Sequence, residues 1–166
     1  MTGLDKMREC VTDCLRAGGV NAVTAWSGED KKRSDGAVVA VSLRGCRGGP
    51  GGFQDYLGER YNAEAGRWEE LYGRRAKLTF GLDIYASGRD GATECQKAFD
   101  AVADALRSGA PLGLSLESLS RQEAVYDGEL GLFRCPAEAV CGAYLYAVAD
   151  EGGTFLDFEV RGGRKQ

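Results

Sequence analysis

The sequence contains no histidine, and this absence removes several kinds of chemistry at once. Serine–histidine and cysteine–histidine catalysis needs an imidazole base, as do the usual proton shuttles near neutral pH. Histidine-ligated metal sites are excluded for the same reason. We therefore expect a protein that is not an enzyme and that uses no metal and no cofactor.

Long apolar runs are also absent. No run approaches the ~20 residues that span a bilayer, and the N-terminus MTGLDKMREC carries charge where a signal peptide would be apolar. The net charge of −4 argues against a dedicated nucleic-acid binder, which usually has a basic excess. We expect no membrane partner, no sequence-specific nucleic acid, and a cytosolic location.

Metal-binding cysteine motifs are lacking, although the chain has six cysteines. No CxxC pair occurs, and Cys10 and Cys14 alone cannot form a zinc site. The cysteines lie at apolar positions of predicted elements, so we expect buried free thiols. An alternative is a reactive Cys46 whose pKa is lowered by Arg44 and Arg47, but no general base accompanies it.

Glycine is abundant instead, at 25 of 166 residues, about twice the usual ~7%. The stretch GCRGGPGG at 45–52 could suggest a phosphate-binding loop. No GK[ST] motif follows it, and no helix is predicted directly after it. We interpret it as part of a flexible arm.

A long half-buried strand is the clearest predicted element. Apolar residues alternate with polar ones from Leu78 to Ala86, which is the period-two pattern of a strand covered on one face. Helical spacing of apolar residues predicts helices at 4–17 and 92–107, with Asp90 as a candidate N-cap of the second. Further strands are predicted at 20–26, 37–43, 112–119, 139–149 and 154–162, with a hairpin at 121–135 turning at Asp127-Gly128.

This order of elements predicts an α+β fold in one domain spanning 1–166. We expect two layers, with two main helices packed on one face of a mostly antiparallel β-sheet, and a frayed tail at 163–166. Buried leucines are predicted at Leu112, Leu114 and Leu116, with Leu119 out of phase.

Residues 44–74 form a long, Gly-rich arm that interrupts this pattern. A structureless loop of that length is uncommon in a compact domain. The arm is therefore either an extended hairpin or a segment that is mobile in a lone subunit and becomes ordered against a partner. Its aromatic and Arg content is typical of a subunit interface. The candidate interface residues are Phe53, Tyr56, Tyr61, Trp68, Tyr72, Arg74 and Arg75.

Three carboxylate pairs could suggest general acid–base chemistry, which needs two carboxyls at a defined distance in a cleft. They are Glu69/Glu70, Asp150/Glu151 and Asp157/Glu159. All three fall in predicted turns or on solvent faces of strands, so we interpret them as solvated acids.

Three stretches resemble tail terminator, or tail completion, proteins of long-tailed bacteriophages and prophages. They are ELYGRRAKLTFGLDIYAS, GATECQKAFDAVADAL and YDGELGLFRCPAEAVCGAYLYAVADEGGTFLDFEVRG, ending in F-x-D-F-x-V-x-G at Phe155–Gly162. The resemblance implies a tail-terminator or tail-tube-like fold and a structural virion assembly role. It implies a homo-oligomeric ring, usually a hexamer, that ends the tail tube and provides the head–tail joining surface.

The partners that the resemblance implies are further copies of the chain, the tail tube protein and a head–tail connector protein. The location implied is the host bacterial cytoplasm during assembly and then the virion tail, with the gene carried by a phage or prophage. Two other readings stay open. One is another tail-tube or head–tail connector component of similar fold, and the other is a bacterial small-ligand-binding α+β domain.

Overall fold

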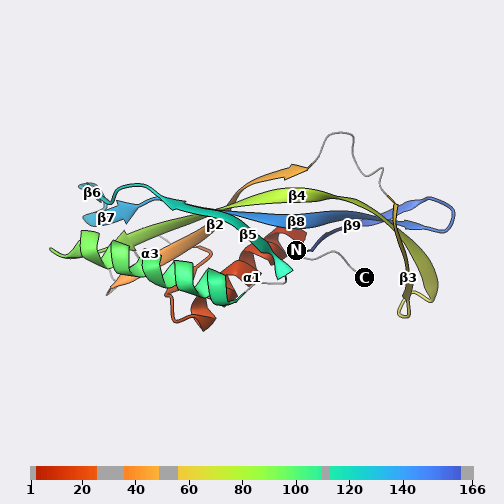
Figure 1. Cartoon of the computed structure of the whole chain (residues 1–166), viewed down its shortest axis with the longest axis horizontal. Coiled ribbons are helices and arrows are strands. Elements are labelled where there is room, and N and C mark those ends of the chain that lie inside the picture. Colours follow the sequence, from red (N-terminus) through yellow and green to blue (C-terminus); the bar gives the residue numbers. More distant parts are fainter. Residues whose placement is uncertain (1–2, 26–35, 49–55, 110–112, 162–166) are drawn as a thin grey trace.

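Two helices cover one face of a single nine-stranded sheet in the computed structural model, which describes residues 3–25, 36–48, 56–109 and 113–161 (Figure 1). Every strand pair in this part of the chain is antiparallel except β1 with β2. The α+β class and the two-layer arrangement predicted from the sequence are confirmed. The elements are α1 (Gly3–Ala17), β1 (Ala22–Val23), β2 (Ala37–Gly48), β3 (Tyr56–Asn62), β4 (Arg67–Ala86), α3 (Gly91–Ser108), β5 (Ser115–Arg121), β6 (Val125–Asp127), β7 (Leu132–Cys135), β8 (Ala137–Asp150) and β9 (Phe155–Arg161).

Helix α1 forms where apolar residues recur at helical spacing, and it buries Met7, Val11 and Leu15 against the sheet. It ends in a Schellman motif, in which the N–H of Val20 bonds to the carbonyl of Leu15. Gly19, at φ +82°, adopts the left-handed conformation that this motif requires. The predicted helix at 4–17 is therefore confirmed to within a residue.

Helix α3 lies beside α1 and buries Cys95, Val102 and Leu106. Asp90 does precede its first turn, but its backbone has φ −94° and ψ 18° and its side chain makes no capping hydrogen bond. Asp90 therefore occupies the predicted N-cap position and its carbonyl accepts the N–H of Glu94 at 2.9 Å, but its side chain does not cap, because this backbone differs from the extended conformation that directs a cap side chain at the first turn. Gly91 packs so closely on Phe133 that a Cβ would overlap the ring.

Strand β4 is the longest element and the centre of the sheet. It pairs with β2 and β3 along one edge and with β8 and β7 along the other. The predicted alternation is confirmed. Fully buried side chains on the face toward the helices are Leu78, Phe80, Leu82 and Ile84. Burying four such side chains contributes roughly 1.5–3 kcal/mol each, so this half of β4 is a substantial part of the hydrophobic core.

Two predicted strands have different lengths in the structure. The strand predicted at 20–26 is reduced to two residues, and Trp26 lies outside the described residues. The strand predicted at 37–43 continues to Gly48. Its pairing with β4 is shifted by a bulge between Leu43 and Gly45 and then resumes as far as Gly48. Residues 44–48 of the predicted arm therefore belong to β2, most of them paired with β4.

Strand β5 shifts its leucine phase part of the way along. A bulge between Leu116 and Ser118 inserts a residue opposite β8, so the side chains beyond it change faces. Leu119 consequently packs against the core, whereas Leu116, which precedes the bulge and lies opposite Cys141, is 37% exposed. Leu114 is buried as predicted, and Leu112 lies outside the described residues.

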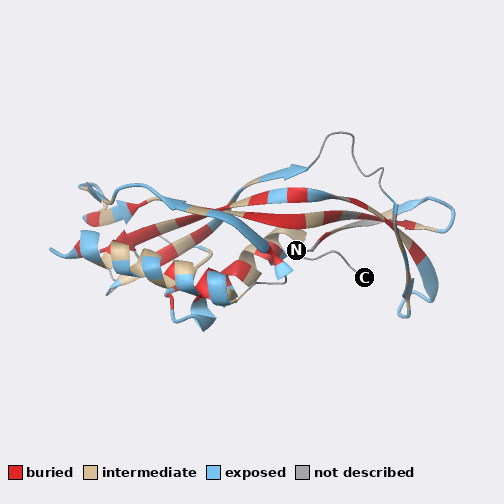
Figure 2. Ribbon diagram, viewed as in Figure 1, coloured by how far each residue is buried: buried red, intermediate tan, exposed pale blue. Residues whose placement is uncertain are grey.

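The molecule is long, with both helices under one end of the sheet and the hairpin of β3 and β4 at the other (Figure 1). Burial follows the same division, because the buried bands face the helices while the hairpin is mostly exposed (Figure 2). A second small cluster, formed by Leu71, Val148, Tyr144 and Leu156, lies toward the hairpin. The hairpin alternative for the arm is thus present in the structure from Tyr56 onward, and 49–55 lie outside the described residues.

Candidate functional site

The most distinctive surface lies on the hairpin of β3 and the first residues of β4. From here on, the name arm refers to the two strands of this hairpin, Tyr56–Asn62 and Arg67–Tyr72, in place of the whole segment 44–74. Its turn is held by Asn62, whose Oδ1 accepts the N–H groups of Glu64 at 3.1 Å and Ala65 at 3.0 Å. Gly66 closes the turn at φ +62°, a conformation that favours glycine. The sequence NAEAG therefore fixes a tight tip.

One face of the arm is aromatic. Tyr61 lies directly across from Trp68 and Tyr56 across from Tyr72, and in both pairs the ring centroids are 5.5 Å apart. Such tilted contacts are favourable cross-strand pairs. Tyr56, Tyr61 and Trp68 nevertheless remain 53%, 55% and 47% exposed. The described part of the chain therefore leaves two pairs of rings on this face in contact with solvent.

Two carboxylates lie between these aromatic pairs on the same face. Glu59 is directly opposite Glu70 in the β3–β4 register. The hydroxyl of Tyr72 donates to Glu70 Oε2 at 2.7 Å, and this bond raises the pKa of Tyr72. Like charges opposite one another destabilise a strand pair. The arm therefore presents rings at both ends of this face and negative charge in the middle.

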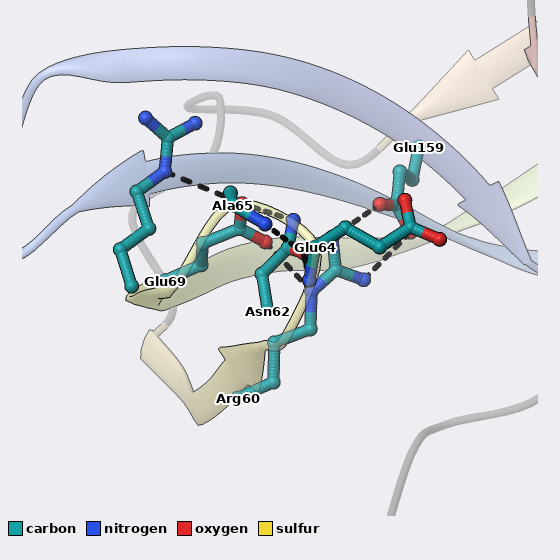
Figure 3. A network of polar contacts seen from close by, with 7 residues as sticks. Arg60, Asn62, Glu64, Ala65, Glu69 and Glu159 are labelled. Carbon is teal, nitrogen blue, oxygen red and sulfur yellow. Dashed lines mark hydrogen bonds and ion pairs between the residues drawn. The ribbon is translucent and has the colours of Figure 1, made fainter.

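The opposite face of the arm carries a polar network centred on Arg60 (Figure 3). Arg60 Nε donates to Glu69 Oε2 at 2.9 Å, and its two Nη atoms donate to Glu159 at 2.5 and 3.1 Å. Asn62 Nδ2 donates to Glu69 Oε1 at 3.0 Å. The hydrogen bonds from Asn62 and Arg60 lower the pKa of Glu69 against the opposing effect of burial.

Glu69 corrects one sequence interpretation. Predicted as a solvated acid, it is only 4% exposed, because the hairpin register places Arg60 opposite it and Asn62 beside it. Glu70, its neighbour in sequence, points to the other face and is half-buried. The two residues therefore do not act as a carboxylate pair.

The predicted interface residues separate into two groups. Tyr56, Tyr61, Trp68 and Tyr72 come together on the aromatic face. Arg75 lies further along β4, where it and Lys77 pair with Glu117 at 3.3 and 2.7 Å. Phe53 and the side chain of Arg74 lie outside the described residues.

Sequence reasoning missed a second charged cluster, on the helix-free face of the sheet. Arg44 Nη2 donates to Asp83 at 2.7 Å and Nη1 to Glu138 at 3.3 Å, while Arg134 pairs with Asp83 at 3.4 Å. Gly81 lies beneath the Arg44 guanidinium, where a Cβ would overlap it. The alternation of β4 indicated on which face Asp83 lies. The other members of the cluster come from three other strands, so they could be identified only once the order of strands in the sheet was known.

Cys46 is the one cysteine of the six classed as exposed. Partial removal of the Cys46 thiol from water raises its pKa, because the charged thiolate loses solvation. The lowered pKa considered from the sequence is therefore wrong. The reason is geometric, since Arg44 is turned toward Asp83 and Glu138. Cys95, Cys135 and Cys141 are buried as predicted, and Cys10 and Cys14 are half-buried.

No helix among the described residues is both long and apolar enough to cross a membrane. The sequence matches no protein-family model, and no curated protein matches it significantly. The arm combines an exposed aromatic face with an opposite face held by ion pairs.

Proposed function

We propose that this protein is a structural assembly protein whose copies join through the arm into a closed ring. The observation that carries the proposal is the aromatic face of the arm, where three rings about half exposed share one hairpin. Aromatic side chains are enriched at protein interfaces and dominate their binding energy. Cross-strand pairing fixes these rings before binding, which lowers the entropy lost on association.

The resemblance of the sequence to tail terminator proteins favours a specific version of this role. In that version the ring ends a phage tail tube and provides the joining surface for the head, with the tail tube protein and a head–tail connector protein as partners. Assembly takes place in the bacterial cytoplasm, and the ring then remains in the virion tail. The protein acts by binding, without making or breaking a covalent bond.

The arm lies at the opposite end of the molecule from the helices, so it can reach a neighbouring copy at a different surface (Figure 1). Such a heterologous contact generates a ring when the rotation between copies closes, and an open filament when it does not. A terminator is expected to form the closed ring, whereas a tube subunit of similar fold is expected to form the open, extending assembly.

Native mass spectrometry and negative-stain imaging of the purified protein test the proposal. We expect one discrete oligomer mass and closed rings. Replacing Trp68→Ala is expected to raise the dissociation constant at least ~30-fold, since an aromatic anchor contributes roughly 2 kcal/mol or more. The matched control is Leu116→Ala, which removes an exposed apolar side chain far from the arm.

Two results would contradict the proposal. Long self-assembled tubes would instead identify a tube subunit. A protein that stays monomeric at all concentrations, with or without added tail tubes, would exclude assembly through the arm.

A further inference from the structure

The ion pair between Arg60 and Glu159 joins two strands that are not neighbours. Arg60 is on β3 and Glu159 on β9, and β4 and β8 lie between them in the sheet. In a flat sheet three strand spacings alone separate the backbones of such residues by roughly 14 Å. The register adds an offset along the strands, because Arg60 is level with Glu69 of β4, whereas Glu159 is level, through Tyr146 of β8, with Gly73. The side-chain tips nevertheless lie 2.5 Å apart. Coiling of the sheet, together with the reach of the two long side chains, therefore brings its two outer strands into contact across one face.

The register shows which face closes. Glu69 is opposite Arg60 in the β3–β4 ladder, and both point to the same side. Bulges between Tyr56 and Gly58 in β3, and at Leu156 in β9 opposite the step from Val148 to Ala149, flank this region. Bulges increase local twist, so they supply the coiling that the ion pair then holds.

The network is well shielded from water. The side chains of Arg60, Glu69 and Glu159 are 19%, 5% and 24% exposed. Arg60 addresses Glu159 with both Nη atoms, the planar two-point geometry in which guanidinium is most directional. Of the other charged groups nearby, Arg67 approaches Glu69 at 3.7 Å, and Asp150 Oδ1 accepts N–H groups of its own turn.

We propose that Arg60 is a positioning residue, which sets the direction of the arm relative to the body by bridging β4 and β9. The arm's own pairs, such as Arg60–Glu69 and Tyr61–Trp68, hold the hairpin together but do not reach β9. The Arg60–Glu159 pair does, so it selects one angle among those the coiled sheet allows. The second part of the proposal rests on the proposed function: the angle of the arm also sets the rotation between successive copies, and this rotation decides whether the ring closes.

Distance measurements between spin labels test the first part without requiring assembly. Labels attached through ketone-bearing side chains at positions 65 and 107, on the exposed arm tip and on α3, avoid the native thiols. We expect one narrow distance distribution in the wild-type protein. Glu159→Gln, which leaves the Arg60–Glu69 pair in place, should broaden it, and Glu159→Lys should shift its centre by repelling Arg60.

The matched control is Arg67→Gln on the same hairpin. Arg67 also pairs with Glu69, but it is 49% exposed and its pair lies within the arm. The control should leave the distribution unchanged. Hydrogen exchange of Leu78–Ala86 in β4 checks that each variant keeps its core. An unchanged distribution in Glu159→Lys with an intact core would overturn the positioning role.

Native mass spectrometry of the same variants tests ring closure. The wild type should give one closed size, and Glu159→Gln a spread of sizes or open chains. If the arm distribution changes but the ring size does not, Arg60 positions the arm without deciding closure, and the second part is overturned. If the wild type never associates, the proposed function fails, while the label distances still decide the positioning role.

Discussion

Glu69 is a buried charged residue whose burial depends on its partners. Its carboxylate is almost fully buried and accepts hydrogen bonds from Arg60 and Asn62. A buried carboxylate is tolerated only when it is paired and hydrogen-bonded, because the desolvation cost is otherwise several kcal/mol. The sequence places two glutamates side by side, and only the hairpin register decides that this one turns inward.

The lowered pKa of Glu69 predicts a loss of stability in acid. The folded-state pKa lies below the ordinary value of ~4.3, so the stabilisation is complete above that pH and is lost as pH falls through the folded pKa. Urea unfolding from pH 7 to pH 2.5 should show a decrease below about pH 4 that is smaller in Glu69→Gln. At pH 7 this variant should be less stable by ~1–3 kcal/mol. Identical pH profiles for the two proteins would contradict this assignment.

Cys46 provides a second residue-scale prediction. It is exposed, whereas the other cysteines are half-buried or buried. Aromatic disulfide reagents should therefore modify one thiol quickly in the native protein, and Cys46→Ser should remove that phase. Because its pKa is raised, the rate at pH 7 should be below that of a free cysteine. A rate above the free thiol would restore the reactive-cysteine alternative.

At the scale of elements, the bulge in β5 decides which leucine supports the core. The bulge turns Leu119, which is out of phase in the sequence, against the core, whereas Leu116 before the bulge is 37% exposed. Leu119→Ala should lower the free energy of unfolding by ~1–3 kcal/mol, and Leu116→Ala by less than ~0.5 kcal/mol. Denaturant unfolding at neutral pH measures both. A loss below ~0.5 kcal/mol for Leu119→Ala would mean that β5 is not bulged in solution.

The elements that sequence reasoning predicted well are those whose signal is local. Helices α1 and α3 and the inner half of β4 carry long apolar periodicities, and each appears within a residue or two of its predicted bounds. Bulges carry no comparable signal, because one extra residue in β5 depends on its pairing with β8. The aromatic face of the arm was predictable from composition, whereas the link from Arg60 to Glu159 required the coiling of the whole sheet.

At the scale of the whole molecule, stability should be graded along β4. Its inner half contacts both helices through the main core, whereas among the described residues its outer half packs on the small cluster around Leu71 and Val148. Amides of Leu78–Ala86 should exchange with global unfolding, and those of Arg67–Tyr72 at least ~10-fold faster through local opening. Hydrogen exchange resolved by residue measures this gradient.

Assembly should change the same gradient. If the arm binds a neighbouring copy, the exchange of Arg67–Tyr72 should slow in the assembled ring while that of Leu78–Ala86 stays the same. Equally strong protection of the arm in monomer and ring would count against the arm as the contact surface.

The opposed pair Glu59 and Glu70 has a consequence for symmetry. Two arms meeting aromatic face to aromatic face about a two-fold axis would gather four carboxylates in one desolvated centre. Repulsion of that kind costs several kcal/mol, so a symmetric arm-to-arm dimer is disfavoured however well the rings stack. In the proposed assembly, the acidic centre would therefore favour contact between an arm and a different surface of the next molecule over contact between two arms.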